Sequence, residues 1–252
     1  MKKELVSIIT PLFNCERFIT QTIESVLSQT YDEWEMIIVN DGSTDSGAMI
    51  VEQYSAFDCR IKLFTQANAG SAAARNNGIR RARGRYIALL DADDTWNSNF
   101  LEQQLNLMKE KNALLVYSSH TRIDENSVEC LKPYIVPEKV QYKDLLRNCY
   151  ISCLTGVYDT SAFGKVYLRE ELKSLRDDYV YWLEIIKKVG IAYGNKNVLA
   201  NYRMLSTSVS RNKKKVIVPQ FRVLYEVEKL GLIRSLYYLS AWAVISYLKY
   251  RK

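Results

Sequence analysis

The sequence predicts an α/β fold in which a mostly parallel sheet is flanked by helices and followed by a C-terminal helical tail. Short apolar runs at residues 6–10 and 36–39 are separated by a stretch in which apolar residues recur at helical spacing. These runs do not alternate with polar residues, which is typical of parallel strands that are covered on both faces. The chain has 252 residues, 48% of them hydrophobic, which is enough for the core of one such domain.

Strands and helices are expected to alternate through the first half of the chain. Phe18, Ile19 and Ile23 follow helical spacing, which predicts an amphipathic helix. The turn residues at 40–45 are followed by residues suited to a helix N-cap, and Gly84 is a natural helix stop. The expected strands are 6–10, 36–39, 61–65 and 86–90, and the expected helices are 16–29, one that ends near 56, and 72–83.

The second half of the chain has a less regular pattern. The expected helices are 100–111, 142–148 and 178–189, and the expected strands are 114–118, 151–158 and 198–203. Two helical segments, about 216–229 and 232–251, close the chain. The sequence contains no internal repeat and no low-complexity segment.

The net charge of +7 is concentrated in the tail. Residues 206–252 hold ten Lys or Arg against two Glu, so the remaining chain is nearly neutral. A nucleic-acid groove needs basic residues on the body as well, so we do not expect nucleic acid as a partner. A basic tail with aromatic and apolar residues points to an anionic membrane surface. A tail helix docked on the body and a dimer contact are the alternatives.

The cysteines and the N-terminus indicate a cytoplasmic protein. Five cysteines without a C-x-x-C pair, together with a single histidine, His120, favour reduced thiols over a disulfide framework or a structural zinc site. No signal peptide precedes the first strand, and no apolar run reaches the roughly 18 residues of a membrane span. We expect a peripheral protein at the inner face of the cell membrane.

Three carboxylates, Asp91, Asp93 and Asp94, directly follow the expected strand at 86–90. Clustered like charges cost free energy unless a cation lies among them. Oxygen ligands at a strand end suit Mg²⁺ or Mn²⁺, which bridge to phosphate oxygens. In parallel sheets, ligands bind beyond the carboxyl ends of the strands. The alternative is an acidic helix N-cap, because Asp94 and Thr95 precede a helix.

Two further features lie near other strand ends. Asp41 is suited to accept hydrogen bonds from a base or a ribose, and its alternative is a turn aspartate before Gly42. The small residues of 68–78 enter a helix, where Gly70 permits close approach of the backbone and the helix N-terminus favours anions. One turn into that helix, Arg75 is able to reach a diphosphate or a carboxylate. The spacing matches neither a P-loop nor a dinucleotide fingerprint.

Together these segments resemble the motifs of family 2 glycosyltransferases of the GT-A, Rossmann-like fold. The residues that carry the resemblance are SIITPLFN at 7–14, NDGSTD at 40–45, NAGSAAARNNG at 68–78 and GRYIALLDADD at 84–94. Four motifs in the family's order and spacing make the resemblance specific, and it covers about residues 5–210. It implies an enzyme that moves a sugar from a nucleotide-diphosphate sugar, UDP by default, to an acceptor hydroxyl.

The resemblance implies a donor-binding half at residues 1–97. Asp93 would be the principal ligand of Mn²⁺ or Mg²⁺, with Asp91 beside it. The residues implied in nucleotide-sugar binding are Pro11, Phe13, Asn14, Asp41, Gly70, Arg75, Asp91, Ala92 and Asp93.

The resemblance also implies an acceptor-binding half at residues 98–205, followed by the tail at 206–252. Asp178 matches the family's catalytic base, with Asp177 as the fallback and Trp182 in the same motif. A carboxylate suits the role, because the base removes a proton from a sugar hydroxyl. An N-terminal helix aspartate favoured by the helix dipole is the alternative.

Arg203 lies in the segment 201–210, which resembles the family's closing motif, and many members carry a histidine where this chain has Leu205. That histidine can join the metal site of the family. Without this histidine, the metal would be held by Asp93, the diphosphate and water. Arg203 or the following Lys/Arg run would supply the missing positive charge.

The implied mechanism is direct displacement with inversion at the anomeric carbon. The metal and Arg75 would stabilise the leaving diphosphate, while Asp178 would take the acceptor proton. The alternatives are a sugar nucleotidyltransferase, a glycoside hydrolase and a non-catalytic sugar-binding module. The chain looks like transferases of bacterial surface-polysaccharide assembly, such as the teichuronic acid type, so the acceptor is expected to be a saccharide or a lipid-linked saccharide.

Overall fold

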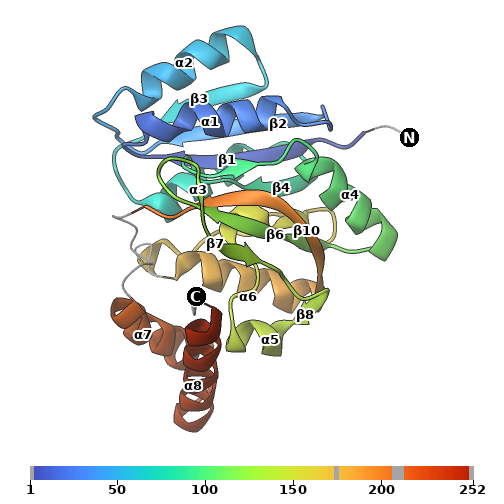
Figure 1. Cartoon of the computed structure of the whole chain (residues 1–252), viewed down its shortest axis with the longest axis vertical. Helices are drawn as coiled ribbons and strands as arrows, with labels where there is room; N and C mark the ends of the chain where they lie inside the picture. Colours follow the sequence, from blue (N-terminus) through green and yellow to red (C-terminus); the bar gives the residue numbers. More distant parts are fainter. Residues whose placement is uncertain (1–2, 173–175, 206–212, 250–252) are drawn as a thin grey trace.

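The computed structural model describes residues 3–172, 176–205 and 213–249. Figure 1 shows a sheet through the body and two tail helices that project from the end of the body opposite the first helices of the chain. The expected α/β class, with a mostly parallel sheet flanked by helices and a helical tail, is confirmed.

The first half of the chain forms the parallel part of the sheet. Its strands are β1 (Val6–Leu12), β2 (Trp34–Asn40), β3 (Ile61–Thr65) and β4 (Tyr86–Leu89), and its helices are α1 (Glu16–Leu27), α2 (Gly47–Phe57) and α3 (Ser71–Arg81). β1 lies between β2 and β4 and is parallel to both, and β3 extends the sheet beyond β2. The carboxyl ends of these strands therefore lie along one edge, where the candidate site is expected.

The second half continues the same sheet with mixed strand directions. Its strands are β5 (Thr95–Trp96), β6 (Leu115–Ile123), β7 (Glu129–Tyr134), β8 (Lys139–Gln141), β9 (Val157–Asp159) and β10 (Ile191–Arg203). The strand order is β3-β2-β1-β4-β9-β6-β10-β5, with β7 beside β6 and β8 beside β10. The helices of this half are α4 (Phe100–Lys111), α5 (Tyr142–Arg147) and α6 (Asp177–Val189). One sheet runs through both halves, so the sheet does not mark a boundary between a donor-binding and an acceptor-binding half. The division at residue 97 therefore stays a prediction.

Apolar side chains fill both faces of the sheet. Neighbouring strand residues point to opposite sides, so that Ile8 and Ile38 join one core cluster while Ile9 and Ile37 join the other. Helices α1, α2 and α4 cover the first face, and α3, α5 and α6 cover the second. Burial on both faces explains why these strands are uninterrupted apolar runs.

Two expected strands differ from the structure. Of the expected strand at 151–158, only Val157 and Tyr158 belong to a strand, β9, which extends to Asp159. Cys153–Thr155 instead form a 3₁₀ turn, η1, in which the Thr155 N–H donates to the Ser152 carbonyl at 3.0 Å. The strand expected at 198–203 begins earlier, at Ile191, and its register shifts between Asn195 and Val198, where polar residues interrupt the apolar pattern. The short strands β5, β7 and β8 are additions to the expected elements.

The tail consists of α7 (Lys213–Arg222), the π-helical segment η4 (Val223–Val227) and α8 (Leu232–Lys249). It docks on the body next to α5 and α6, since Val223 and Leu224 are buried in the core cluster of that face. Tyr238 and Leu239 of α8 pack against the same cluster. The docked-helix alternative for the tail is therefore correct, and what its outer surface does is a separate question.

Candidate active site

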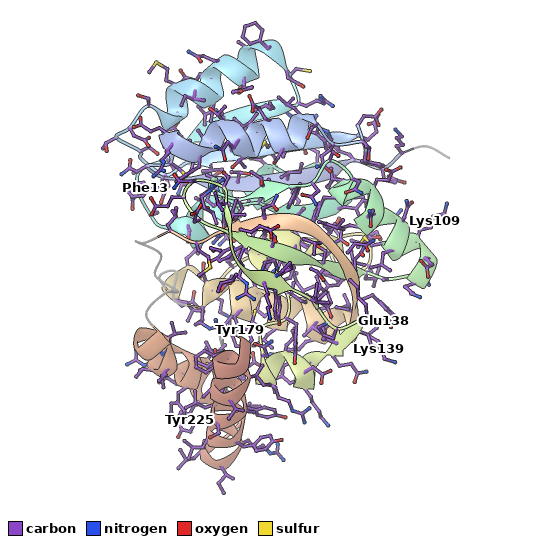
Figure 2. All side chains as sticks on the ribbon, in the orientation of Figure 1. Phe13, Lys109, Glu138, Lys139, Tyr179 and Tyr225 are labelled. Carbon is purple, nitrogen blue, oxygen red and sulfur yellow. The ribbon has the colours of Figure 1, made fainter. Side chains whose placement is uncertain are left out.

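The loop after β1 and the loop after β2 are tied together at the edge of the sheet. The Asn14 N–H donates to the Ser43 hydroxyl at 3.1 Å, and the Thr44 N–H donates to the Asn14 side chain at 2.9 Å. Asn14 has a left-handed backbone conformation, with φ of 47°, which turns the chain sharply after Phe13. Phe13 is 51% exposed and projects from the edge of the body in Figure 2, and Pro11 is half-buried. An exposed aromatic ring beside a strand end is a surface available for stacking.

Asp41, at the end of β2, organises the loop that leads into α3. Its carboxylate accepts hydrogen bonds from the Gln66 side chain and from the backbone N–H groups of Ala69 and Gly70, each at 2.8 Å. Gly70 has φ of 91°, a conformation that L side chains rarely adopt. Because Asp41 is buried and fully engaged, its bonds in this structure are to the loop and not to the turn at Gly42.

The acidic turn after β4 splits its side chains between the interior and the surface. Asp91 and Asp93 are half-buried, whereas Ala92 and Asp94 are buried. The Asp94 carboxylate accepts a hydrogen bond from the Arg203 backbone N–H at 2.7 Å, and β5 separates it from α4. Asp94 is therefore no N-cap for α4, and that alternative is wrong.

The charge state of this turn fits a site for a hard cation. Burial, followed by the negative charge of Asp91, raises the pKa of Asp93 to about 6. A nearby positive charge would relieve both the repulsion and the cost of burial. Carboxylate oxygens are the ligands that Mg²⁺ and Mn²⁺ prefer. Among the described residues no third His, Cys, Asp or Glu joins them, so the remaining ligands of a cation would come from elsewhere.

Arg75 links this turn to the start of α6. Its Nη2 donates to Asp91 Oδ1 at 2.5 Å, and its Nη1 lies 3.6 Å from Asp177 Oδ2. Burial disfavours the charged guanidinium, but the carboxylates of Asp91 and Asp177 outweigh this and keep the pKa of Arg75 well above its usual range. Of the two partners expected for Arg75, a diphosphate or a carboxylate, the structure places carboxylates beside it.

The two aspartates at the start of α6 have different surroundings. Asp177 is buried against Arg75, and burial together with the charge of Asp178 raises its pKa. Asp178 is half-buried and therefore more accessible. Both lie in the first turn of α6, where the helix dipole favours a negative charge, so the dipole alternative remains open.

Arg203 and Trp182 lie inside the protein beneath this edge. The Arg203 guanidinium donates to the carbonyls of Asp93 and Asp124 at 2.8 and 3.0 Å and to the Gln21 side chain at 2.7 Å. Arg203 therefore fixes the acidic turn from behind, and its guanidinium is not brought to the open side of the site. Trp182 is fully buried and packs against Gly156. The rest of the closing motif, residues 206–210, and Arg211 and Asn212 after it lie outside the described residues.

The comparisons with known proteins bear on this geometry. A family model described as glycosyl transferase family 2 matches residues 7–176, which includes the strand-end loops and the acidic turn. The chain belongs to glycosyl transferase family 2. Membership in this family identifies the chain as a glycosyltransferase and decides against the nucleotidyltransferase and glycoside hydrolase alternatives.

Two relatives of this family 2 chain match over nearly its whole length. A Bacillus subtilis (strain 168) protein named as the putative teichuronic acid biosynthesis glycosyltransferase TuaG is 37% identical over 98% of this chain and 96% of its own. An Escherichia coli protein, WfgD, is 38% identical over 99% of this chain and 96% of its own. Its name is UDP-Glc:alpha-D-GlcNAc-diphosphoundecaprenol beta-1,3-glucosyltransferase. The resemblance to transferases of bacterial surface-polysaccharide assembly is thereby confirmed.

Solved structures of glycosyltransferases share the fold. S. aureus TarS in complex with UDP-GlcNAc superposes with a TM-score of 0.68 at 19% identity, over 94% of this chain and 71% of that one. The mannosyltransferase PcManGT from Pyrobaculum calidifontis, solved with GDP-Man and Mn²⁺, superposes with a TM-score of 0.63 at 15% identity, over 96% and 73%. These likenesses confirm the GT-A fold expected for the family 2 chain.

Sequence reasoning missed one supporting residue of the family 2 site. Thr22 of α1 is buried, and its hydroxyl lies 2.9 Å from the Ala92 carbonyl and 2.8 Å from the Asp94 carbonyl. A polar residue at the inward spacing of an apolar helix is the signal that marks Thr22 in the sequence. Its hydroxyl, like the guanidinium of Arg203, holds the acidic turn through main-chain carbonyls.

Proposed function

We propose that this glycosyltransferase is metal-dependent and inverting, and that it transfers a sugar from a UDP-sugar to a lipid-linked saccharide in bacterial cell-surface polysaccharide synthesis. One observation carries the proposal: Arg75 joins Asp91, in the acidic turn, to Asp177, next to the candidate base Asp178. Carboxylates suited to a cation and a carboxylate suited to proton removal thus belong to one connected site.

The donor side of the site combines stacking and anion binding. Phe13 and Asn14 lie beside the turn after β2 and would hold the nucleotide with Pro11. Asp41 acts indirectly, because its bonds to Ala69 and Gly70 set the loop at the N-terminus of α3. Helix N-termini attract phosphate groups, so this loop would face the diphosphate.

The cation site would be built on Asp93, with Asp91 beside it. A divalent cation at this position would stabilise the negative charge that develops on the departing diphosphate. Arg75 has carboxylates beside both of its terminal nitrogens. It is therefore better placed to hold Asp91 and Asp177 together than to contact the diphosphate itself.

The transfer step needs one base and no covalent intermediate. The acceptor hydroxyl oxygen attacks the anomeric carbon from the side opposite the diphosphate. As that bond forms, the bond from the anomeric carbon to the diphosphate oxygen breaks, and the electron pair leaves with UDP. Asp178 takes the hydroxyl proton, a role for which its half-exposed position in the first turn of α6 is suited.

The name of the relative WfgD supplies the donor and the acceptor of the proposal. WfgD is named as transferring from UDP-Glc to alpha-D-GlcNAc-diphosphoundecaprenol, and it matches nearly the whole chain. A lipid-linked acceptor would bring the enzyme to the inner face of the cell membrane. No helix in the described part of the chain has the length and apolar character of a membrane span.

The tail offers a surface for peripheral membrane contact. The outer face of α8, made of Leu232, Ile233, Leu236, Tyr237 and Val244, is apolar, and its residues are between 48% and 85% exposed. The same tail carries the exposed basic residues Arg222, Lys229 and Arg234. Apolar side chains flanked by positive charge favour an anionic lipid surface, whereas two copies of this basic tail would repel each other.

A thermal-shift screen of nucleotide sugars with and without Mn²⁺ tests the donor and cation assignments. A ligand at a hundredfold excess over its Kd stabilises the native state by about 2.7 kcal/mol. We expect a UDP-sugar to raise the Tm only when Mn²⁺ is present, and Asp93→Asn to remove most of the shift. A folded protein whose Tm responds to no nucleotide sugar with Mn²⁺ would contradict the proposal.

A further inference from the structure

The inner face of α8 reaches the segment that carries the candidate base. Trp242 is only 9% exposed and faces the body, on the side of α8 opposite its outer face. The Trp242 ring centroid lies 6.0 Å from the guanidinium carbon of Arg176. Arg176 directly precedes Asp177 and Asp178. We propose that Trp242 is a positioning residue for Asp178 that acts through Arg176; this inference rests on the proposed role of Asp178.

The backbone of Arg176 is held in an uncommon conformation. Its φ is 67°, in the left-handed region, and it occupies the N-cap position of α6. A non-glycine residue in this region is strained, and the conformation persists only where its surroundings hold it. The direction in which α6 begins, and so the position of Asp178, depends on whatever fixes Arg176.

Aromatic rings are what fix the Arg176 side chain. Its guanidinium carbon lies 4.5 Å from the Tyr179 ring centroid, and Trp242 lies at the greater distance. Its Nε and Nη2 are buried and have no hydrogen-bond partner among the residues that the structure describes. Because these two donors lack a partner, the contacts of the guanidinium with the Tyr179 and Trp242 rings contribute to holding the side chain in place.

The tail is anchored firmly enough to present Trp242 to Arg176. The buried Glu228 carboxylate, just after η4, accepts a hydrogen bond from the Tyr142 hydroxyl of α5 and lies 2.6 Å from the Lys187 ammonium of α6. Figure 2 labels Tyr179 where α6 meets the tail. The tail thus contacts α6 at its C-terminal end through Lys187 and at its N-terminal end through Arg176.

The segment positioned by Trp242 is also the one that joins the two carboxylate groups of the site. After Arg176 comes Asp177, which faces Arg75, and Arg75 binds Asp91 of the acidic turn. A shift of Arg176 would move Asp178 directly, while the buried pair of Asp177 and Arg75 would resist the shift. We therefore expect loss of the ring to reduce turnover more than donor binding.

The experiment compares Trp242→Leu, Trp242→Phe and Tyr225→Leu in the full chain. Tyr225, also in the tail, is exposed and stacks on Phe221, so it is a matched loss of an aromatic ring away from Arg176. Two measurements are made: transfer from UDP-glucose to N-acetylglucosaminyl diphosphate with a short alkyl chain, and amide hydrogen exchange of residues 176–180. The Tm of each variant records its stability.

We expect Trp242→Leu to lower kcat about tenfold with the KM for the UDP-sugar within about twofold, and to speed exchange at the start of α6. Trp242→Phe, which keeps a ring, should recover most of kcat, and Tyr225→Leu should match the wild type. Equal kcat and equal exchange in Trp242→Leu and wild type would overturn the proposal. It would also be overturned if Trp242→Phe lost kcat as well and the decrease of kcat in both variants simply followed the decrease of their Tm. If the wild type transfers no sugar from UDP-glucose or any other UDP-sugar, the proposed function fails, and the exchange measurement still decides whether Trp242 holds the start of α6.

Discussion

Arg75 and Asp91 form a short ion pair, with 2.5 Å between Nη2 and Oδ1, that joins α3 to the acidic turn after β4. The same guanidinium faces Asp177 at the start of α6. Through these two contacts the Arg75 guanidinium links two elements of the donor side, α3 and the acidic turn, to α6 of the acceptor side. Its position makes Arg75 the side chain whose loss should disturb both stability and turnover.

We predict that Arg75→Met lowers the free energy of unfolding by about 3 kcal/mol, because it leaves the buried Asp177 without its ion-pair partner. Urea denaturation measures this change. The control is Arg169→Met, which breaks a pair with Glu184 that is much more exposed and should cost under about 1 kcal/mol. Equal decreases in the free energy of unfolding of the two variants would contradict the idea that burial makes the Arg75–Asp177 pair more important for stability than an exposed pair.

Replacing the two aspartates of α6 one at a time should have different effects, on turnover for Asp178 and on stability for Asp177. Asp178→Asn should lower kcat by a factor of about 100 or more while UDP-sugar binding survives, because the amide cannot take the acceptor proton. Steady-state kinetics and thermal shift with the donor measure the two effects. Asp177→Asn should instead weaken the contact with Arg75 and lower Tm. Near-normal turnover by Asp178→Asn would rule out that residue as the base.

Cation binding should depend on pH through Asp93. Burial and the charge of Asp91 raise the pKa of Asp93 to about 6, above the roughly 4 of a free aspartate. Between these values the folded state holds a proton that the unfolded state has lost. The stability that Asp93 contributes at low pH is thus lost as pH rises through this window.

A cation requires the deprotonated carboxylate, so the Tm increase caused by Mn²⁺ with UDP should be larger at pH 8 than at pH 5. Thermal shift at both pH values measures it, and Asp93→Asn, which cannot titrate, is the control. An increase that is the same at both pH values in the wild type would argue against Asp93 as the ligand.

Gly156 should be intolerant of any side chain because of Trp182. A Cβ on Gly156 would lie 2.3 Å from Cη2 of that ring, which is itself fully buried and cannot move freely. We predict that Gly156→Ala lowers the free energy of unfolding by about 2–3 kcal/mol, measured by chemical denaturation. At Gly164 an added Cβ meets no atom of the described residues within 4 Å, but φ is 75°, so only the backbone cost of about 1 kcal/mol should appear in Gly164→Ala. A smaller loss at Gly156 than at Gly164 would be inconsistent with this packing.

The outer face of α8 should control membrane contact without controlling turnover. Replacing Ile233 and Leu236 with Ser removes apolar area from an exposed surface. Binding to liposomes that contain anionic lipid should fall by a factor of about 100 or more, because each of the two buried aliphatic side chains contributes about 1.5–3 kcal/mol. Met49→Ser, an exposed apolar residue of α2 at the opposite end of the molecule, is the control. Unchanged liposome binding would count against the membrane proposal and leave the inference about Trp242 intact.

The sequence alone determined the longer strands, the helices and most of the strand-end residues of this glycosyltransferase, but not the short strands β5, β7 and β8. Uninterrupted apolar runs predict buried parallel strands, and turn residues after each run mark the edge where Asp41 and Asp91 lie. These signals are local, because side-chain periodicity reports burial and turn residues report backbone geometry. The pattern failed at 151–158, where Gly156 and a 3₁₀ turn interrupt an apolar run, and at Asn195, where polar residues interrupt a strand.

Only the tertiary structure decided how the acidic residues divide their tasks. Asp93 and Asp94 are neighbours of the same type, yet one is half-exposed and the other is buried against the backbone of Arg203. Asp177 and Asp178 differ in the same way, because the first is buried and the second is half-exposed. The contact of Trp242 with Arg176 also depends on the tertiary structure, since it joins residues 66 positions apart in the chain. Burial and charge partners arise from packing between distant segments, and no local pattern of residues encodes them.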